Sequence, residues 1–271
     1  MATKFFRFIG GHGVFFKDLT LKKSEDNHAC FNVLHDNYDW GEINDDSYYD
    51  CPLFDVTREY FPSILKSWFD KSDRENVRYS FYSSYFQGSS YSSDRLITAA
   101  NMFDIFPGKA LKKALPNEAE GLLASLRNQV KEDFSSFKEL KESLLFSIGA
   151  LTKKTLKERI LERLDVLKPA LDLNKSTYED LEYIVGFAVK CRNFYVHGTE
   201  HKKLTPNLCF EFQSAFVDAL EFIYAMSELV ESGWHPKFKD HLSSHNKILR
   251  FEREISPVSS QLRAVLGGQS A

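Results

Sequence analysis

The chain has 271 residues, of which 43% are hydrophobic and 27% are charged, with 13 Gly and 8 Pro. This composition excludes collagen-like, low-complexity and wholly disordered proteins, and the length predicts one or two folded domains. The sequence contains 35 Lys and Arg residues and 38 Asp and Glu residues, so the net charge is −3. Any contact with nucleic acid must therefore be local rather than driven by a basic surface.

The cysteines and the hydropathy pattern give no sign of a metal site or a membrane span. The four cysteines, at 30, 51, 191 and 209, include no C-x-x-C spacing, and no His completes a zinc ligand set. The chain has no run of about 18 apolar residues, and its start lacks the apolar stretch of a signal peptide. We expect a soluble, reduced, cytoplasmic protein that uses no metal ion or other cofactor.

Residues 1–60 are predicted to form a small region of strands and loops. Short aromatic or alternating runs at 5–9 and 13–16 are separated by breaks rich in Gly, Asp and Asn. Between 36 and 55 the chain carries seven acidic residues and no Lys or Arg. Such a block is typical of a solvated acidic loop, and a metal or partner site is the alternative.

Residues 61–236 are predicted to form an antiparallel bundle of about five helices. A short helix around Trp68 is followed by a Ser-rich stretch, in which Ser93 is expected to cap a second helix. Capping residues, apolar stripes and Gly or Pro at the ends mark four further helices. Asn117 with Glu120 starts a long helix that is broken near 135–136, and the next helix covers 156–167 before Pro169. Ser176 with Glu179 starts a helix that ends at Gly198, and Thr205 with Pro206 starts a helix whose apolar stripe runs from 212 to 230.

Residues 237–271 are predicted to form a basic C-terminal tail. Five Lys and Arg residues against two Asp and Glu residues lie between 237 and 253. We expect an exposed tail or a short helix there, with contact to phosphates as the alternative. Residues 266–271 are expected to be disordered.

The segment Arg192-Asn193-Phe194-Tyr195-Val196-His197-Gly198 ends the helix that begins near Ser176. At about 100° per residue, His197 shares a face with Asn193 and Lys190, while Arg192 lies about 140° away. A straight helix would not bring Arg192 and His197 together. A joint role therefore needs a frayed helix end, a long reach of the Arg side chain or a second subunit.

This Arg-Asn-x-x-x-His-Gly pattern at the end of a bundle helix resembles the signature of the HEPN superfamily, in particular the bacterial abortive-infection proteins of the ApeA type. The segment from Ser93 to Asp104 resembles the early helix of those proteins, and the resemblance covers about 60–235. It implies a mainly α fold, a HEPN-like bundle with a small N-terminal β and loop appendage. It also implies a homodimeric, metal-independent endoribonuclease in anti-phage defence or toxin-type growth arrest.

The resemblance also implies roles for single residues. His197 would act as general acid or base, Arg192 would hold the scissile phosphate, and Asn193 would orient groups nearby. Asp104 would approach the Arg or His, although a solvated carboxylate at a helix end is the alternative. Because RNA supplies its own 2′-hydroxyl nucleophile, the expected product is a 2′,3′-cyclic phosphate, formed at a site shared by the two subunits.

Three lysines flank the motif, and they could grip RNA phosphates or simply be solvated: Lys190, Lys202 and Lys203. Without the resemblance, His197 would be interpreted as a residue that caps the negative end of its helix rather than as a catalyst. Two alternatives to a nuclease stay open. One is a non-catalytic HEPN module that dimerises or binds a nucleotide or partner, and the other is a regulatory fragment that binds a partner through its N-terminal 60 residues. The acidic net charge favours both alternatives over general RNA binding. A nuclease that is selective for a structured RNA such as tRNA, however, need not be basic overall.

Overall fold

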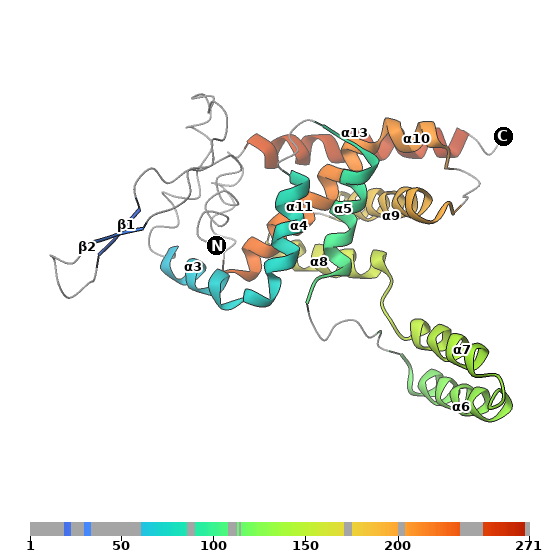
Figure 1. The fold of residues 1–271 in the computed structure, drawn as a ribbon. Helices are drawn as coiled ribbons and strands as arrows, with labels where there is room; N and C mark the ends of the chain where they lie inside the picture. The colour runs from blue at the N-terminus through green and yellow to red at the C-terminus, as the bar shows by residue number, and fades with distance from the viewer. Residues whose placement is uncertain are drawn as a thin grey trace.

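The computed structural model describes residues 19–22, 30–33, 61–85, 90–107, 113, 115–170, 175–199, 204–233 and 246–268. These residues are mainly α-helical, which confirms the predicted fold class (Figure 1). Within the N-terminal region, strand β1 (Leu19–Lys22) pairs antiparallel with β2 (Cys30–Val33). The predicted strands at 5–9 and 13–16 and the acidic block lie outside the described residues.

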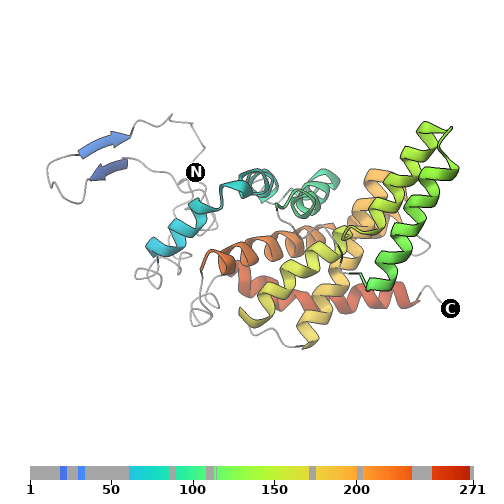
Figure 2. The same cartoon turned by 90° about the horizontal axis from the view of Figure 1, so that it is seen from below.

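The helices pack around α11 (Gln213–Glu231), which contacts α4, α5, α8, α9 and α13. Figures 1 and 2 show it crossing the middle of the bundle. In the ranges that the structure describes, no helix is both long and apolar enough to cross a membrane. The elements of this helical part, in chain order, are α3 (Phe61–Asp70), the 3-10 turn η2 (Ser72–Arg74), α4 (Glu75–Tyr85), α5 (Ser93–Asp104), α6 (Asn117–Asp133), α7 (Lys138–Leu151), α8 (Leu156–Ala170), α9 (Lys175–His197), α10 (Pro206–Glu211), α11, and α13 (Asn246–Gly268).

Helix α11 is buried on most of its surface, because other helices cover it on several sides. The predicted apolar stripe forms the core, with Phe216, Ala219 and Ile223 almost fully buried. The same helix also buries two carboxylates, Glu221 and Glu228. A buried charge is costly unless it is paired and hydrogen-bonded, so the partners of these two carboxylates determine how the neighbouring helices must pack.

Arginines from α4 and α5 neutralise the two carboxylates. Arg78 of α4 donates from Nε and Nη2 to Glu228 Oε1 at 3.0 and 2.6 Å, and its guanidinium lies 3.7 Å from the Trp68 ring centroid. Arg95 of α5 donates from Nε and Nη2 to the two oxygens of Glu221, at 3.1 and 2.9 Å. Such two-pronged contacts fix orientation as well as distance. They therefore set how α4 and α5 lie on α11.

Helix α8 is attached to α11 in the same way, nearer the end of α11. Arg163 donates from Nε to Ser227 Oγ at 2.9 Å and from Nη1 to Glu231 Oε1 at 2.6 Å. Arg74 of η2 joins this group through Glu228 at 2.7 Å and through a short ion pair with Glu231. Two segments far apart in the sequence, η2 and α8, thus meet on α11.

The helix ends confirm one capping prediction and correct others. Thr205 caps α10 as predicted. Thr155 forms a reciprocal capping box with Glu158 at the start of α8, which the sequence analysis did not predict. Ser92, not Ser93, caps α5. No side chain caps α6, so Asn117 and Glu120 do not form the predicted capping box. Helix α4, which lies partly in the Ser-rich stretch, was not predicted.

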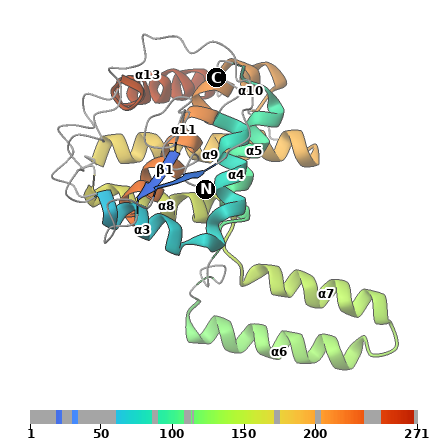
Figure 3. The same ribbon diagram turned by 60° about the vertical axis from the view of Figure 1, so that its left-hand side comes forward.

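Helices α6 and α7 form an antiparallel hairpin with its break at 134–137, as the pattern near 135–136 predicted. Figures 1 and 3 show the hairpin projecting from the bundle. It packs mainly on itself, through Val130 and Ile148. The apolar stripe that marked this segment as helical is largely exposed on the hairpin, because no part of the described bundle covers it.

Helix α13 shows that part of the sequence assigned to an exposed tail packs on the bundle. Ile255, Leu262 and Leu266 are buried against α9 and α11. The helix continues to Gly268, beyond the point where disorder was expected. Its anchor on α9 is Asp180, whose carboxylate accepts hydrogen bonds from three α13 side chains, namely Ser256, Ser259 and Arg263, at 2.8, 2.8 and 2.6 Å.

Replacing Glu228 with Ala is expected to lower the free energy of unfolding by about 3–5 kcal/mol, because Arg78 then remains buried without its partner. Urea unfolding measures the change. The control is Glu211→Ala, at an exposed position just before α11, which should change stability by less than about 0.5 kcal/mol. Equal effects of the two substitutions would contradict the structural role of Glu228.

Replacing Asp180 with Ala is expected to loosen α13, seen as faster amide hydrogen exchange in 255–266 but not in α8. Glu179→Ala, at the exposed neighbouring position, should leave the exchange unchanged.

Burial alone would raise the pKa of Asp180, but the hydrogen bonds from Ser256, Ser259 and Arg263 outweigh it and hold that pKa below its usual value. A carboxylate whose pKa is lower in the folded protein than its unfolded pKa of about 3.9 stabilises the fold at pH values above about 3.9. This stabilisation is lost as the pH falls through the pKa of the folded state. In the parent protein, α13 should therefore loosen only below about pH 4, and exchange that does not change with acid would contradict this anchor.

Candidate active site

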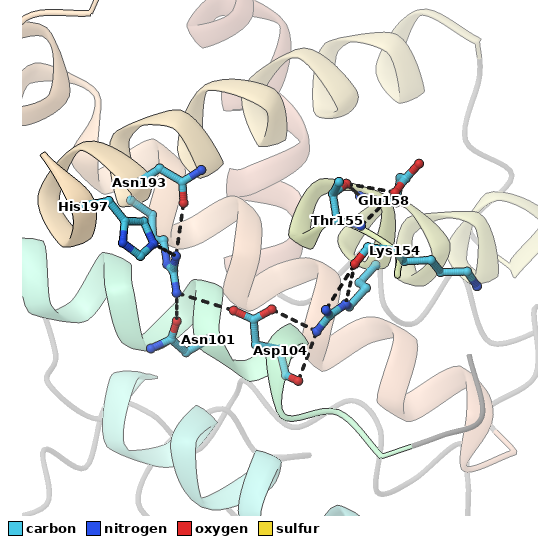
Figure 4. Close-up of polar contacts among 9 residues, drawn as sticks. Asn101, Asp104, Lys154, Thr155, Glu158, Asn193 and His197 are labelled. Atoms are coloured by element: carbon cyan, nitrogen blue, oxygen red, sulfur yellow. Dashed lines mark hydrogen bonds and ion pairs between the residues drawn. The ribbon is translucent and has the colours of Figure 1, made fainter. Parts of the chain in front are cut away.

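The polar residues of the motif meet side chains of α5 and α8 at one place on the surface of the bundle. Asn101 and Asp104 come from the last turns of α5, and Asn193 and His197 come from the end of α9 (Figure 4). The Arg192 side chain joins these two helices. Three of the predicted site residues therefore lie around Arg192 within one chain.

Arg192 is held by four side chains. Its Nη2 donates to Asn101 Oδ1 at 2.8 Å and forms a longer contact with Asp104 Oδ2 at 3.5 Å. Its Nη1 donates to Asn193 Oδ1 at 3.1 Å and contacts His197 Nε2 at 3.3 Å. The guanidinium has two N–H groups on each of these nitrogens, so its four terminal N–H groups are matched by four acceptors.

His197 is the last residue of α9, and the helix remains regular up to it. Gly198 follows with a φ of +62° and donates its N–H to Phe194 O at 2.9 Å, which is the left-handed C-terminal cap that the sequence predicted. Arg192 and His197 start from different faces of α9, as expected, but the long Arg192 side chain reaches the His197 ring. The contact needs neither a frayed helix end nor a second subunit.

The contact with Arg192 bears on which nitrogen of the His197 ring can act as a base. A guanidinium only donates hydrogen bonds, so a hydrogen bond at this contact has Nε2 as its acceptor. Such a bond requires the tautomer that carries its proton on Nδ1. This is the form in which an imidazole can accept a proton from a substrate.

Asp104 lies between two arginines. Oδ2 faces Arg192, and Oδ1 accepts a hydrogen bond from Arg159 Nη1 at 2.9 Å, with a second bond from the same nitrogen to the Asp104 carbonyl at 3.2 Å. The carboxylate is one-third exposed, yet it is not merely solvated. It contacts the Arg of the motif, as the resemblance implied.

Arg159 is a member of the site that the sequence analysis missed. It lies on α8, 55 residues after Asp104, and no local pattern connects the two. The start of α8 holds it firmly, because Arg159 Nε and Nη2 also donate to the Lys154 carbonyl at 3.2 and 3.1 Å. Hydrogen bonds from Lys113 and from the Thr155 amide lower the pKa of Glu158, the capping residue beside Arg159, to about 2.

Asn101 is the second residue that the sequence analysis did not single out as a site residue. It precedes Asp104 by three positions, so the two side chains share one face of α5. That spacing within the segment 93–104 was the available signal. Asn101 makes the shortest contact to Arg192, and we expect it to fix where the guanidinium lies.

Of the three lysines predicted to contact RNA phosphates, the structure describes Lys190. The Lys190 ammonium lies over the Phe187 ring, 4.5 Å from its centroid, two turns before His197. Lys202 and Lys203 lie outside the described residues. Their contribution to RNA binding stays a prediction.

Cys191, next to Arg192, is not available as a nucleophile. Its side chain is buried beside Cys209, which is also buried. The hydrogen bond with Cys209 and burial both raise the pKa of the Cys191 thiol, so it stays protonated at neutral pH. Its role is packing, and the groups that can exchange protons or meet an anion at this site are His197 and Arg192.

Comparison with known proteins gives a family match that spans this site. The sequence model of the Apea-like HEPN family matches residues 97–258, which include all the polar residues described above. No curated protein and no solved structure matches the chain. In the part of the chain that the structure describes, no group of three or more His, Cys, Asp or Glu side chains could hold a metal ion. With a match over more than half of its length, the chain belongs to the Apea-like HEPN family.

Proposed function

We propose that this protein is a HEPN-type endoribonuclease that needs no metal ion and acts in anti-phage defence or growth arrest. The observation that carries the proposal is the direct contact between Arg192 Nη1 and His197 Nε2 at 3.3 Å, on a surface that RNA can reach. A cation and a neutral imidazole side by side are the groups that a phosphodiester cleavage by the 2′-hydroxyl requires. Membership of the Apea-like HEPN family supports the same reaction.

The reaction begins with a change of partner at Arg192. All four terminal N–H groups of Arg192 are engaged, so a phosphate oxygen must displace an acceptor to bind there. The contact with His197 is the exposed one, whereas Asn101 and Asp104 hold Nη2 from the partly buried side. A phosphate that takes the place of His197 at Nη1 frees the Nε2 lone pair, so substrate binding itself uncovers the base.

In the chemical step, the phosphoryl group is transferred from the 5′-oxygen to the 2′-oxygen. His197 Nε2 takes the proton from the 2′-hydroxyl, the 2′-oxygen attacks phosphorus, and the bond to the 5′-oxygen breaks. Arg192 opposes the charge that develops on the phosphoryl oxygens. The leaving 5′-oxygen takes a proton from water or from the imidazole ring that the first transfer protonated, which leaves a 2′,3′-cyclic phosphate and a 5′-hydroxyl. In a homodimer, two copies of the ring can divide the two proton transfers.

A second candidate function is a non-catalytic HEPN module that dimerises or binds a nucleotide or a partner. The observation that favours it is that the contacts of both terminal nitrogens of Arg192 are made to acceptors of its own chain. If these contacts persist when a phosphate arrives, the group is a structural brace between α5 and α9 and not a catalytic site.

The test incubates the full chain with total cellular RNA in excess EDTA and analyses the fragment ends. We expect 2′,3′-cyclic phosphate ends from the parent protein and from Val196→Ala, which changes the exposed neighbour of His197. His197→Ala should lower the rate by about 10²–10⁴-fold, the usual contribution of a general base. Folding of each variant is checked by circular dichroism.

Two outcomes would contradict the nuclease. Equal cleavage by the parent and by folded His197→Ala would remove His197 from the chemistry. The absence of cleavage in every preparation, together with binding of RNA or nucleotide, would favour the second candidate.

A further experiment tests whether Arg159 acts through Asp104 as a positioning residue. Arg159→Gln and Asp104→Ala are each expected to lower kcat by about 10- to 100-fold with little change in KM, because Arg192 then shifts from its place. If the two residues act through one contact, the double variant should lose no more than the worse single variant. Losses that multiply would contradict the coupling, and Lys175→Gln, at an exposed position at the start of α9, serves as the control.

A further inference from the structure

Two asparagines hold Arg192 through their carbonyl oxygens, and this fixes what the rest of each amide can do. Arg192 donates to Asn101 Oδ1 at 2.8 Å and to Asn193 Oδ1 at 3.1 Å. Because a guanidinium has no acceptor, turning either amide over would set an NH2 group against an N–H group. Each amide nitrogen, Nδ2, therefore faces away from the guanidinium and can serve a ligand only as a donor.

The amide nitrogen of Asn101 is open to a substrate. Among the described residues it has no hydrogen-bond partner, and solvent reaches it. Asn101 is half-buried on α5, and Figure 4 shows its amide nitrogen pointing away from Asp104. A polar group that is held in one orientation and is not yet engaged gives a binding site its specificity.

The acceptor oxygens around Arg192 are engaged inside the protein. The side-chain oxygens of Asn101 and Asn193 and one oxygen of Asp104 face Arg192. The other oxygen of Asp104 accepts a hydrogen bond from Arg159 at 2.9 Å. A ligand group that must donate, such as an amino group, therefore meets no unengaged acceptor oxygen in this polar group. Leaving such a donor without water or a partner is costly.

The four RNA bases differ in this respect at one exocyclic group. Uracil and guanine carry the carbonyl oxygens O4 and O6, whereas cytosine and adenine carry amino groups on the corresponding carbons. Proteins that recognise single-stranded RNA hydrogen-bond to these groups on the Watson–Crick edges of unstacked bases. A fixed donor pairs with the carbonyl oxygen and is opposed by the amino group.

We propose that Asn101 Nδ2 contacts the base of the nucleotide that supplies the 2′-hydroxyl, and that it makes the protein prefer uracil or guanine there over cytosine or adenine. The inference rests on the proposed function, because it takes the scissile phosphate to lie on Arg192. That nucleotide is held at its phosphate by Arg192 and at its 2′-hydroxyl by His197, so its base has a defined position.

Asn101, and not Asn193, is suited to contact the base. Asn193 bonds to Nη1 of Arg192, the nitrogen at which the phosphate replaces His197, so its amide is next to the phosphate. Asn101 bonds to Nη2, on the other side of the same planar group. Asn101 is therefore a specificity-determining residue that takes no part in the proton transfers.

The test measures kcat/KM of the full chain on four oligonucleotides with 2′-O-methyl ribose throughout, except for one ribonucleotide that carries U, G, C or A. Only the phosphate after that ribonucleotide can be cleaved. We expect the parent protein to favour U and G over C and A by about 10-fold. Asn101→Asp keeps the acceptor for Arg192 but replaces the donor with an acceptor, so it should favour C and A.

The matched control is Asn128→Asp, which makes the same change at an exposed position of α6 and should keep the preference of the parent. A residue that only supported Arg192 would change all four rates by one factor. If Asn101→Asp does not fold, as judged by circular dichroism, Asn101→Ala decides, and it should abolish the preference.

Three outcomes would overturn the inference and leave the proposed function standing. They are equal rates of the parent on all four substrates, a preference that separates pyrimidines from purines, and a preference that the Asn101 variants leave unchanged. A parent that cleaves none of the substrates would count against the proposed function itself. Binding of the four nucleoside 3′-monophosphates, measured by calorimetry, then decides the inference, and equal affinities would overturn it.

Discussion

The neutralisation of carboxylates buried on α11 is the constraint on which the rest of the structure depends. Glu221 and Glu228 lie seven residues apart and therefore on one face of the helix, and both are buried. Arg95 and Arg78 can satisfy them only if α5 and α4 lie at fixed heights on α11. Buried ion pairs of this type contribute little net stability compared with apolar packing, but removing one partner is costly. Their effect here is to fix how α4 and α5 lie on α11.

The candidate site inherits its geometry from these pairs. Arg95 fixes α5, whose last turns present Asn101 and Asp104 to Arg192. Arg163 fixes α8 on the same face of α11, and Arg159, one turn earlier, reaches Asp104. The site is thus a surface group positioned by a buried network of charges. Its two rigid sides, α5 and α9, are bridged by one guanidinium, which explains how a long and flexible side chain can hold a defined position.

Local signals in the sequence were sufficient for the features that depend on neighbouring residues. The cap at Thr205, the Gly198 helix end, the break near 135–136 and the core stripe of α11 were all predicted, because each depends on residues within a few positions. Contacts between distant segments were not predictable in this way. Arg159 and Asp104 are 55 residues apart, and α13 was treated as a tail because its basic residues were weighed and its buried stripe of Ile255, Leu262 and Leu266 was not. The meeting of Arg192 with His197 depended on side-chain reach, which helical angles alone omit.

The insertion of the α6–α7 hairpin between Asp104 and Arg159 also affects how the chain can fold. Joining these two residues in an unstructured chain would close a loop of more than 50 residues, whose entropic cost rises with the logarithm of its length. Once the hairpin has formed on its own, the segments 105–116 and 152–155 are all that remain to be closed. This shorter loop lowers the entropic cost of loop closure by about 1 kcal/mol. A projecting element that adds nothing to the core can therefore make the assembly of α5 with α8 more favourable, and it does so through the unfolded chain and not through contacts in the folded one.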